Sequence, residues 1–263
     1  MTEELHGGIA NSGRVVREGD AVLRPAPANA RTLHALLEHL VSRGFPSPLP
    51  LGVRNDGREE FRFIPGETSA PPYPEEWVSS ADTLTQIGRL LGLLHDATRE
   101  FPLSPDAVWS PELADPHGGG VICHNDVCIE NVVFSHGRVV GLLDFDFAAP
   151  GRPVWDLAMT ARFWVPLQDP VSAAASGREH LDPFRRVREF ADAYGADDEI
   201  RQAFTTALIE IEELALRFVT ERVDQGEKAF IEMWNDLGGH ERHHRKMTWL
   251  NENRSRIDDA LVA

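Results

Sequence analysis

The spacing of leucines predicts two amphipathic helices in the first hundred residues. The segment 30–43 follows Asn29, a residue type that caps helices, and it is ended by Gly44 and Pro46. A second helix is predicted from a cap at Ser79 or Ser80 to Thr98. In both segments apolar residues recur every three or four positions, which places them on one helix face. These apolar residues are Leu33, Leu36, Leu37 and Leu40 in the first segment, and Leu84, Ile87, Leu91 and Leu94 in the second.

Short apolar runs bounded by turn residues predict strands. The segment 14–25 reads as a hairpin whose turn is Glu18-Gly19-Asp20, and residues 61–64 read as a strand that stops at Pro65-Gly66. The stretch 105–120 is loop-like. Further strands are predicted at 121–123, 131–134 and 139–143, the last two on either side of a turn at 135–137.

The order of these elements predicts an α+β protein with two lobes. Predicted strands lie mostly near the N-terminus, helices dominate the end of the chain, and the connection 66–74 is rich in proline. We therefore expect a nucleotide-binding lobe at 1–68 with a small antiparallel sheet, and a mainly helical lobe at 69–263. Glu210, Glu212 and Glu213 in one late helix, and the run 241–246 in another, are typical of solvated charged faces.

Composition narrows the class of protein. The chain has 263 residues, 42% of them hydrophobic and 26% charged, which is enough apolar material for a core. The formal net charge of −16 argues against nucleic acid as a partner; acidity commonly serves solubility, and beyond that it favours a cationic ligand. Cys123 and Cys128 are expected to be reduced thiols. Neither a basic, apolar start nor a membrane-length apolar run is present, so a cytoplasmic protein without membrane contact is expected.

One segment combines polar residues that suit phosphoryl transfer. It runs from His124-Asn125-Asp126 to Asn131, and Asp144-Phe145-Asp146 follows at the end of an apolar strand. Transfer of a phosphoryl group requires a hydroxyl held in line and metal ions that offset phosphate charge. Mg²⁺ prefers oxygen ligands, so Asn131 and Asp144 are the predicted metal ligands. Asp126 is predicted to orient the acceptor hydroxyl and take its proton, with His124 supporting the loop. Asp146 is either a second ligand or a loop anchor.

This segment resembles the catalytic loop of aminoglycoside phosphotransferases, choline kinases and homoserine kinases, where His-Gly-Asp is followed by Asn and then by Asp after a hairpin. The segments 90–95 and 153–158 resemble the family's helix before that loop and its segment after the metal-binding Asp. The resemblance implies a bilobal protein-kinase-like fold, Mg²⁺, and ATP or GTP as donor. It also implies that Gly7 and Gly8 cover the phosphates and that the backbone of Arg62, Phe63 and Ile64 meets the adenine.

The chain departs from the family where a Lys on a strand normally pairs with a Glu on the next helix. Arg24 stands at the strand position and is expected to bind nucleotide phosphates; His34 stands where the Glu is expected, and Glu38, one turn later, could supply the counter-charge. The expected activity is phosphorylation of an alcohol group on a small molecule, such as an antibiotic or a choline-, homoserine- or sugar-type metabolite. The alternative is a pseudokinase-like nucleotide-binding or immunity module. Oligomeric state is not readable from the sequence.

Overall fold

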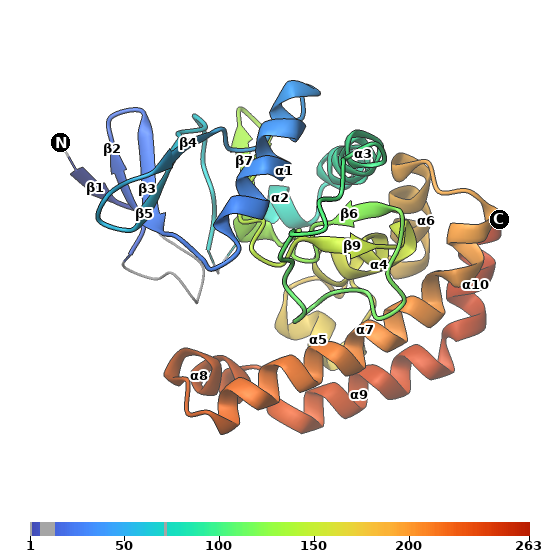
Figure 1. The fold of residues 1–263 in the computed structure, drawn as a ribbon. Helices are drawn as coiled ribbons and strands as arrows, with labels where there is room; N and C mark the ends of the chain where they lie inside the picture. Colours follow the sequence, from blue (N-terminus) through green and yellow to red (C-terminus); the bar gives the residue numbers. More distant parts are fainter. Residues whose placement is uncertain (1, 6–13, 71–72) are drawn as a thin grey trace.

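The computed structural model describes residues 2–5, 14–70 and 73–263. Its N-terminal part is an antiparallel sheet with strand order β1-β2-β3-β5-β4, seen on the left in Figure 1. The mainly helical remainder matches the predicted α+β class. The sheet strands are β1 (Thr2–Glu4), β2 (Val16–Glu18), β3 (Ala21–Pro25), β4 (Pro50–Val53) and β5 (Arg58–Arg62).

The sheet confirms the predicted hairpin and corrects the predicted strand at 61–64. Strands β2 and β3 pair around Gly19, as expected. Strand β5 spans Arg58–Arg62, so it begins earlier than predicted and ends before residues 63 and 64. The charged residues at its start have partners: Arg58 pairs with Asp56, Glu59 with Arg24, and Glu60 with Arg54. Arg24 lies directly opposite Glu59 in the β3–β5 register. Strand β4 was not predicted, since its Pro50 and Gly52 are residues that sheets usually disfavour.

Helix α1 (Ala30–Ser42) packs between this sheet and the helical part of the protein (Figure 1). Its leucine face is buried as predicted. The predicted cap is wrong in detail: Asn29 occupies the N-cap position, but its side chain accepts no hydrogen bond from the first turn. In α3 (Ala81–Thr98), by contrast, the Ser80 side chain accepts bonds from two backbone N–H groups, as predicted.

The larger part of the chain contains two small antiparallel pairs surrounded by helices. Strand β6 (Val121–Cys123) pairs with β9 (Ala149–Gly151), and β7 (Val132–Ser135) pairs with β8 (Arg138–Leu142). The segment 105–120 carries no regular element, as expected. The helices are α2 (Glu75–Val78), α3, α4 (Pro153–Trp164), α5 (Pro170–Ala175), α6 (Pro183–Tyr194), α7 (Asp198–Asp224), α8 (Lys228–Asp236), α9 (Gly239–Glu252) and α10 (Arg254–Val262).

One hydrophobic core runs from α1 through the helical part. It joins Leu36 of α1, Leu91 of α3 and Phe204 of α7 in a single cluster of buried side chains. Helices α3 and α6 approach so closely that a Cβ added to Gly88 would lie 2.9 Å from the Phe190 carbonyl oxygen. Helix α3 also packs against strand β6, and the polar loop 124–131 follows that strand.

The segment that connects the sheet to the helices is hydrogen-bonded to strand β7. Glu67 forms an isolated antiparallel bridge with Phe134 of β7, with N···O distances of 2.7 and 2.8 Å. The division of the chain at residues 68 and 69 stays a prediction.

None of the helices among the described residues combines the length and the apolar character that a membrane span requires. Cys123 and Cys128 are free and buried, as expected.

Candidate active site

The polar loop begins where β6 ends and is held by its own hydrogen bonds. His124 is buried; its Nε2 donates to the Leu143 carbonyl at 2.9 Å and its Nδ1 accepts the Asp126 N–H at 3.2 Å. Burial lowers the pKa of His124, which favours this neutral form. Asn125 has a φ of 65°, a left-handed conformation that Asn tolerates where the family's usual residue is Gly. The loop thus keeps its conformation with Asn in place of Gly.

Asp126 and Asn131 contact each other directly. The Asn131 Nδ2 donates to the Asp126 backbone oxygen at 2.9 Å and to Asp126 Oδ2 at 3.0 Å. A short 3-10 turn, Ile129–Asn131, brings the two residues together across five positions. Burial, and then the nearby Asp144 carboxylate, raise the pKa of Asp126 to about 7. A carboxyl group with a pKa near neutrality is suited to proton transfer at physiological pH.

Asp144 and Asp146 follow β8 and share a guanidinium. Arg24 Nη1 lies 3.0 Å from Asp144 Oδ1, and Arg24 Nη2 lies 2.5 Å from Asp146 Oδ1. Asp144 has a φ of 60°, so its carboxylate is presented by a left-handed backbone turn. Burial and the neighbouring Asp144 charge raise the pKa of Asp146. The Arg24 guanidinium therefore connects the sheet to the two acids of this turn.

The counter-charge of Arg24 was predicted wrongly. Glu38 is exposed on α1, whereas Arg24 Nε donates to Glu59 Oε1 at 2.6 Å. Glu59 is fully buried, and its second oxygen lies 2.9 Å from His34 Nε2. The acid thus comes from the neighbouring strand β5, and His34, at the helix position where the family has Glu, bonds to that acid.

The residues around Asp126 fit a divalent cation. Asp144, Asp146 and Glu59 place three carboxylates around the Arg24 guanidinium, and Asp126 lies close enough to Asp144 to feel its charge, so negative charge is in excess. Within the part of the chain that the structure describes, the Asn131 amide oxygen accepts no hydrogen bond, since only its Nδ2 is engaged. Carboxylate and amide oxygens are the ligand types that Mg²⁺ takes. The donor set therefore suits Mg²⁺ held by Asn131 and Asp144.

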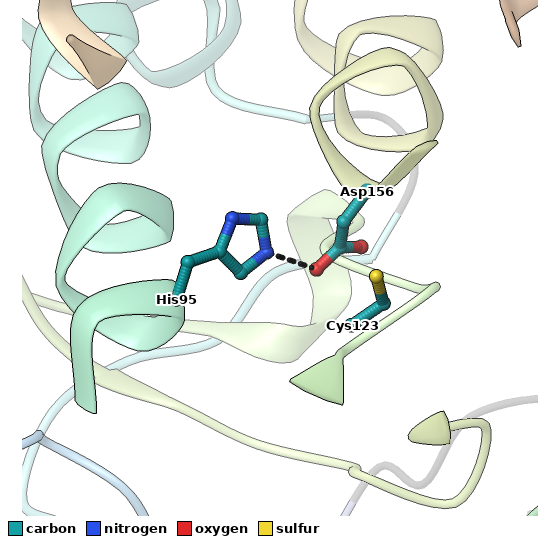
Figure 2. A group of neighbouring side chains, drawn as sticks. All are labelled: His95, Cys123 and Asp156. Carbon is teal, nitrogen blue, oxygen red and sulfur yellow. Dashed lines mark hydrogen bonds and ion pairs between the residues drawn. The ribbon is translucent and has the colours of Figure 1, made fainter. Parts of the chain in front are cut away.

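Asp156 of α4 anchors the loop from below. Its Oδ2 accepts the His124 N–H at 2.7 Å and its Oδ1 accepts the Asn125 N–H at 2.9 Å. His95 of α3 also points at this carboxylate, with Nε2 3.1 Å from Oδ2, as Figure 2 shows. Burial alone would raise the pKa of Asp156, but the bonds from His95 and His124 hold it below its usual value.

Cys123 completes a compact group with His95 and Asp156 in Figure 2, in which one atom of each lies within 4.8 Å of the others. The chemistry argues against a metal at this place. The Asp156 oxygens are occupied by backbone N–H groups and by His95. Burial raises the pKa of the Cys123 thiol well above its usual range, whereas a metal ligand must be a thiolate. The group is therefore a support of the catalytic loop.

The predicted adenine-binding segment 62–64 stays a prediction. The Arg62 N–H already donates to Leu49 O at 2.9 Å and the Phe63 N–H to Asp20 O at 2.8 Å. A nucleotide base could therefore use the carbonyl groups of this segment and the N–H of Ile64. Gly7 and Gly8 lie outside the described residues.

The prediction of solvated faces is wrong for Glu212 and for Lys246, whereas Glu241 and His244 of the run 241–246 are exposed as predicted. The Glu212 side chain is 4% exposed and accepts from Arg162 Nε at 2.7 Å and from Lys246 Nζ at 2.5 Å. The two cations hold the pKa of Glu212 at about 2 although burial alone would raise it. This burial could not be predicted because Glu212 of α7 meets partners from two other helices, α4 and α9, and a buried charge resembles an exposed one in a sequence pattern.

Comparisons with known proteins agree with this geometry. The family model described as phosphotransferase enzyme family matches residues 105–190, which include Asp126, Asn131 and Asp144. The trifolitoxin immunity protein of Rhizobium leguminosarum bv. trifolii is 30% identical over 97% of this chain and 98% of its own length. The homoserine kinase of Gluconobacter oxydans is 26% identical over 72% of this chain and 75% of its own length.

Solved structures of similar fold are small-molecule kinases. A choline/ethanolamine kinase family protein from Mesorhizobium loti superposes with a TM-score of 0.65 at 18% identity, covering 99% of this chain and 92% of its own. The AMP complex of LicA gives a TM-score of 0.59 at 14% identity, covering 95% and 91% of the two chains. The GDP complex of aminoglycoside 2'-phosphotransferase-IIIa gives 0.54 at 13% identity, covering 97% and 92%. On its sequence relatives and its protein-kinase-like fold, the chain belongs to the phosphotransferase enzyme family.

Proposed function

We propose that this protein transfers the terminal phosphoryl group of ATP or GTP to a hydroxyl group of a small molecule. The observation that carries the proposal is the grouping of Asp126, Asn131 and Asp144: Asn131 bonds to Asp126, and the Asp144 charge acts on the Asp126 carboxyl. The AMP and GDP complexes of the fold relatives support a nucleotide as donor.

Each of these residues has a distinct proposed role. Asp126 Oδ2 is held by Asn131, so Oδ1 is the atom that would accept the proton of the acceptor hydroxyl. Asn131 and Asp144 would hold Mg²⁺, which when bound offsets the charge of the nucleotide phosphates. Arg24 would orient the phosphates through N–H groups of its guanidinium, because its position on β3 is that of the family's Lys. The backbone at 62–64 would bind the base.

A phosphotransfer assay tests this proposal. Nucleotide consumption and acceptor phosphorylation would be measured by mass spectrometry for the wild type, Asp126→Ala and the exposed-site control Asp106→Ala. We expect turnover by the wild type and the control, and a loss of at least a hundredfold for Asp126→Ala with nucleotide binding retained. A wild type that binds Mg²⁺-nucleotide but phosphorylates none of a broad panel of alcohols would contradict the proposal.

A second candidate function is immunity, favoured by the nearly full-length match to the trifolitoxin immunity protein. Under this alternative the protein protects its host from a toxic compound, either by phosphorylating it or by binding it without turnover. Expression of the wild type and of Asp126→Ala in a sensitive host, challenged with an antibiotic panel, separates the two routes. Protection that survives Asp126→Ala indicates binding, protection that is lost indicates phosphorylation, and no protection in either strain excludes immunity to those compounds.

A further inference from the structure

A cluster of cations lies where helices α4 and α9 meet α7 and reaches the loop after α5. It comprises Arg162, Arg178, Arg242 and Lys246. Arg162 and Lys246 share the single carboxylate of Glu212. In Figure 1, α7 and α9 run side by side, so residues far apart in the sequence contribute to one place.

Two of these cations have no carboxylate within ion-pair distance among the described residues. Arg178 Nη1 donates to the Phe163 carbonyl at 2.8 Å and its Nε to Ser176 Oγ at 3.4 Å, both neutral groups. The Arg242 side chain forms no ion pair or hydrogen bond with the described residues, although it is half-buried; Glu212 and Asp169 act on its charge only from beyond contact distance. The residues outside the described ranges, 1, 6–13 and 71–72, include no Asp or Glu that could pair with either.

Contacts connect this cluster to the catalytic loop. The charge of Arg162 acts on the Asp126 carboxyl and lowers its pKa against the effect of burial. Trp164, in the last turn of α4, donates from Nε1 to the Val127 carbonyl at 2.7 Å. Tyr73 donates its hydroxyl to Glu130 of the same loop and lies near Arg178. The cluster therefore borders the catalytic loop through contacts separate from those of Arg24.

The unpaired guanidiniums are costly unless they bind something. Burial lowers the pKa of both Arg178 and Arg242, and the more distant charges of Glu212 and Asp169 offset only part of that lowering at Arg242. A partly desolvated cation gains most from a hydrogen-bonded anion, and guanidinium groups match carboxylates and phosphates in a bidentate manner. In a chain with a net charge of −16, a concentration of positive charge beside the catalytic carboxylate is not explained by solubility.

We propose that the acceptor carries, besides its reacting hydroxyl, an anionic group that binds between Arg178 and Arg242, with Arg162 adding positive charge on the side of Asp126. This inference rests on the proposed phosphotransferase function and names its substrate class: a hydroxylated carboxylate or phosphate. It replaces the cationic acceptor suggested by the net charge. Lys246 and Glu212 hold Arg162 in place and do not contact the acceptor.

The test is a comparison of acceptors and of matched variants. Hydroxy acids and hydroxy amino acids (glycerate, serine, homoserine), phosphorylated alcohols (glycerol 3-phosphate), cationic alcohols (choline, kanamycin) and neutral glycerol would be assayed with the wild type, Arg178→Gln, Arg242→Gln and Arg245→Gln. Arg245 lies on the same helix as Arg242 but is already paired with Asp169 and Glu241. It is therefore the control for loss of one charge from α9.

We expect anionic alcohols to be used best, with KM raised at least tenfold in Arg178→Gln and Arg242→Gln, kcat nearly unchanged, and KM within about twofold of wild type in Arg245→Gln. The preference between hydroxy acids and phosphorylated alcohols shows whether the anionic group of the acceptor is a carboxylate or a phosphate. Preferred use of choline or kanamycin, or an unchanged KM in both variants, would overturn the inference while leaving phosphotransfer intact.

Binding to the inactive Asp126→Asn protein, measured by calorimetry with the same probes, separates this inference from the proposed function. Binding of glycerate, serine or glycerol 3-phosphate that Arg242→Gln weakens supports the anion site even if no turnover is found. Absence of binding by every anionic probe, beside binding of a cationic one, refutes it.

Discussion

Arg24 and Glu59 face each other across the β3–β5 ladder, so their ion pair is a cross-strand pair within the N-terminal sheet. A pair formed between a strand and a helix depends on where the helix lies. Here both partners belong to one hydrogen-bonded ladder, and Arg24 extends from it to Asp144 and Asp146. The position of this guanidinium relative to the acids is therefore set by the sheet.

Removal of the Arg24 charge should destabilise the protein. Arg24→Met leaves the fully buried Glu59 without its cation, and loss of one partner of a buried pair costs about 3–5 kcal/mol. Chemical denaturation should show this loss for Arg24→Met and a recovery of part of it in Arg24→Met/Glu59→Gln, where the stranded charge is also gone. Equal stability of wild type and Arg24→Met would mean that the pair contributes nothing net.

Asp126→Asn should reduce activity and increase stability. The pKa of Asp126 in the folded protein, about 7, is raised above the ordinary value of 3.8, so the folded state binds the proton more tightly than the unfolded state. The ionised carboxylate is then a cost that is absent below about pH 4, grows as the pH rises, and is complete above pH 7.

The neutral Asn should therefore raise the melting temperature most at pH 8 and least at pH 4. The corresponding gain in the free energy of unfolding should be on the order of a few kcal/mol at most. Thermal melts of both proteins at a series of pH values, without nucleotide or metal, measure this. A gain that is the same at every pH would exclude Asp126 ionisation as its source.

The Mg²⁺ dependence of phosphotransfer should change when the proposed ligand Asp144 is replaced. Chelation with EDTA should abolish phosphotransfer and added Mg²⁺ should restore it, since the proposed ligands are oxygen atoms of Asn131 and Asp144. Asp144→Asn should require at least tenfold more Mg²⁺ for half-maximal activity and should show a smaller Mg²⁺-induced rise in melting temperature with nucleotide present. The surface variant Asp106→Asn should match the wild type in both measurements.

Asp156→Asn should perturb the loop 124–131 without changing the N-terminal sheet. The Asn amide would place N–H groups against at least one of the backbone donors of His124 and Asn125, which the carboxylate now accepts. We expect a loss of about 1–3 kcal/mol in stability and a fall in kcat larger than the change in nucleotide affinity. Calorimetric nucleotide titration beside initial-rate kinetics gives both quantities; a fall in nucleotide affinity alone would contradict this role.

The sequence predicted elements well where side-chain periodicity and turn residues agreed. Leucines at helical spacing located α1 and α3, and the turn at Gly19 located the β2–β3 hairpin. Strands β4 and β9 were not predicted because Pro50 and Pro150 argue against a strand, yet Pro50 lies in an edge strand of the five-stranded sheet and Pro150 in the two-stranded pair β6–β9, where proline is tolerated. The predicted position of strand β5 was shifted because the charged residues at its start hide the alternation of apolar and polar side chains.

The catalytic loop could be predicted because its residues lie close together in the chain and carry a recognisable pattern. Glu59 could not, because its burial depends on Arg24, which is 35 positions away. A search for acids on the strand expected to pair with β3 could have found it. Arg178 and Arg242 were missed for a similar reason, since charge patterns along one helix do not reveal which charges lack a partner.

Helix α4 carries Asp156 near its start and Arg162 near its end, and so joins the loop anchor to the cation whose charge acts on Asp126. A rigid helix transmits displacement along its length, so a substitution that shifts α4 to suit a different acceptor also moves the backbone of His124 and Asn125. Divergence of substrate preference in this protein should therefore proceed through α9 and the loop after α5, with α4 the least permissive of these segments to change.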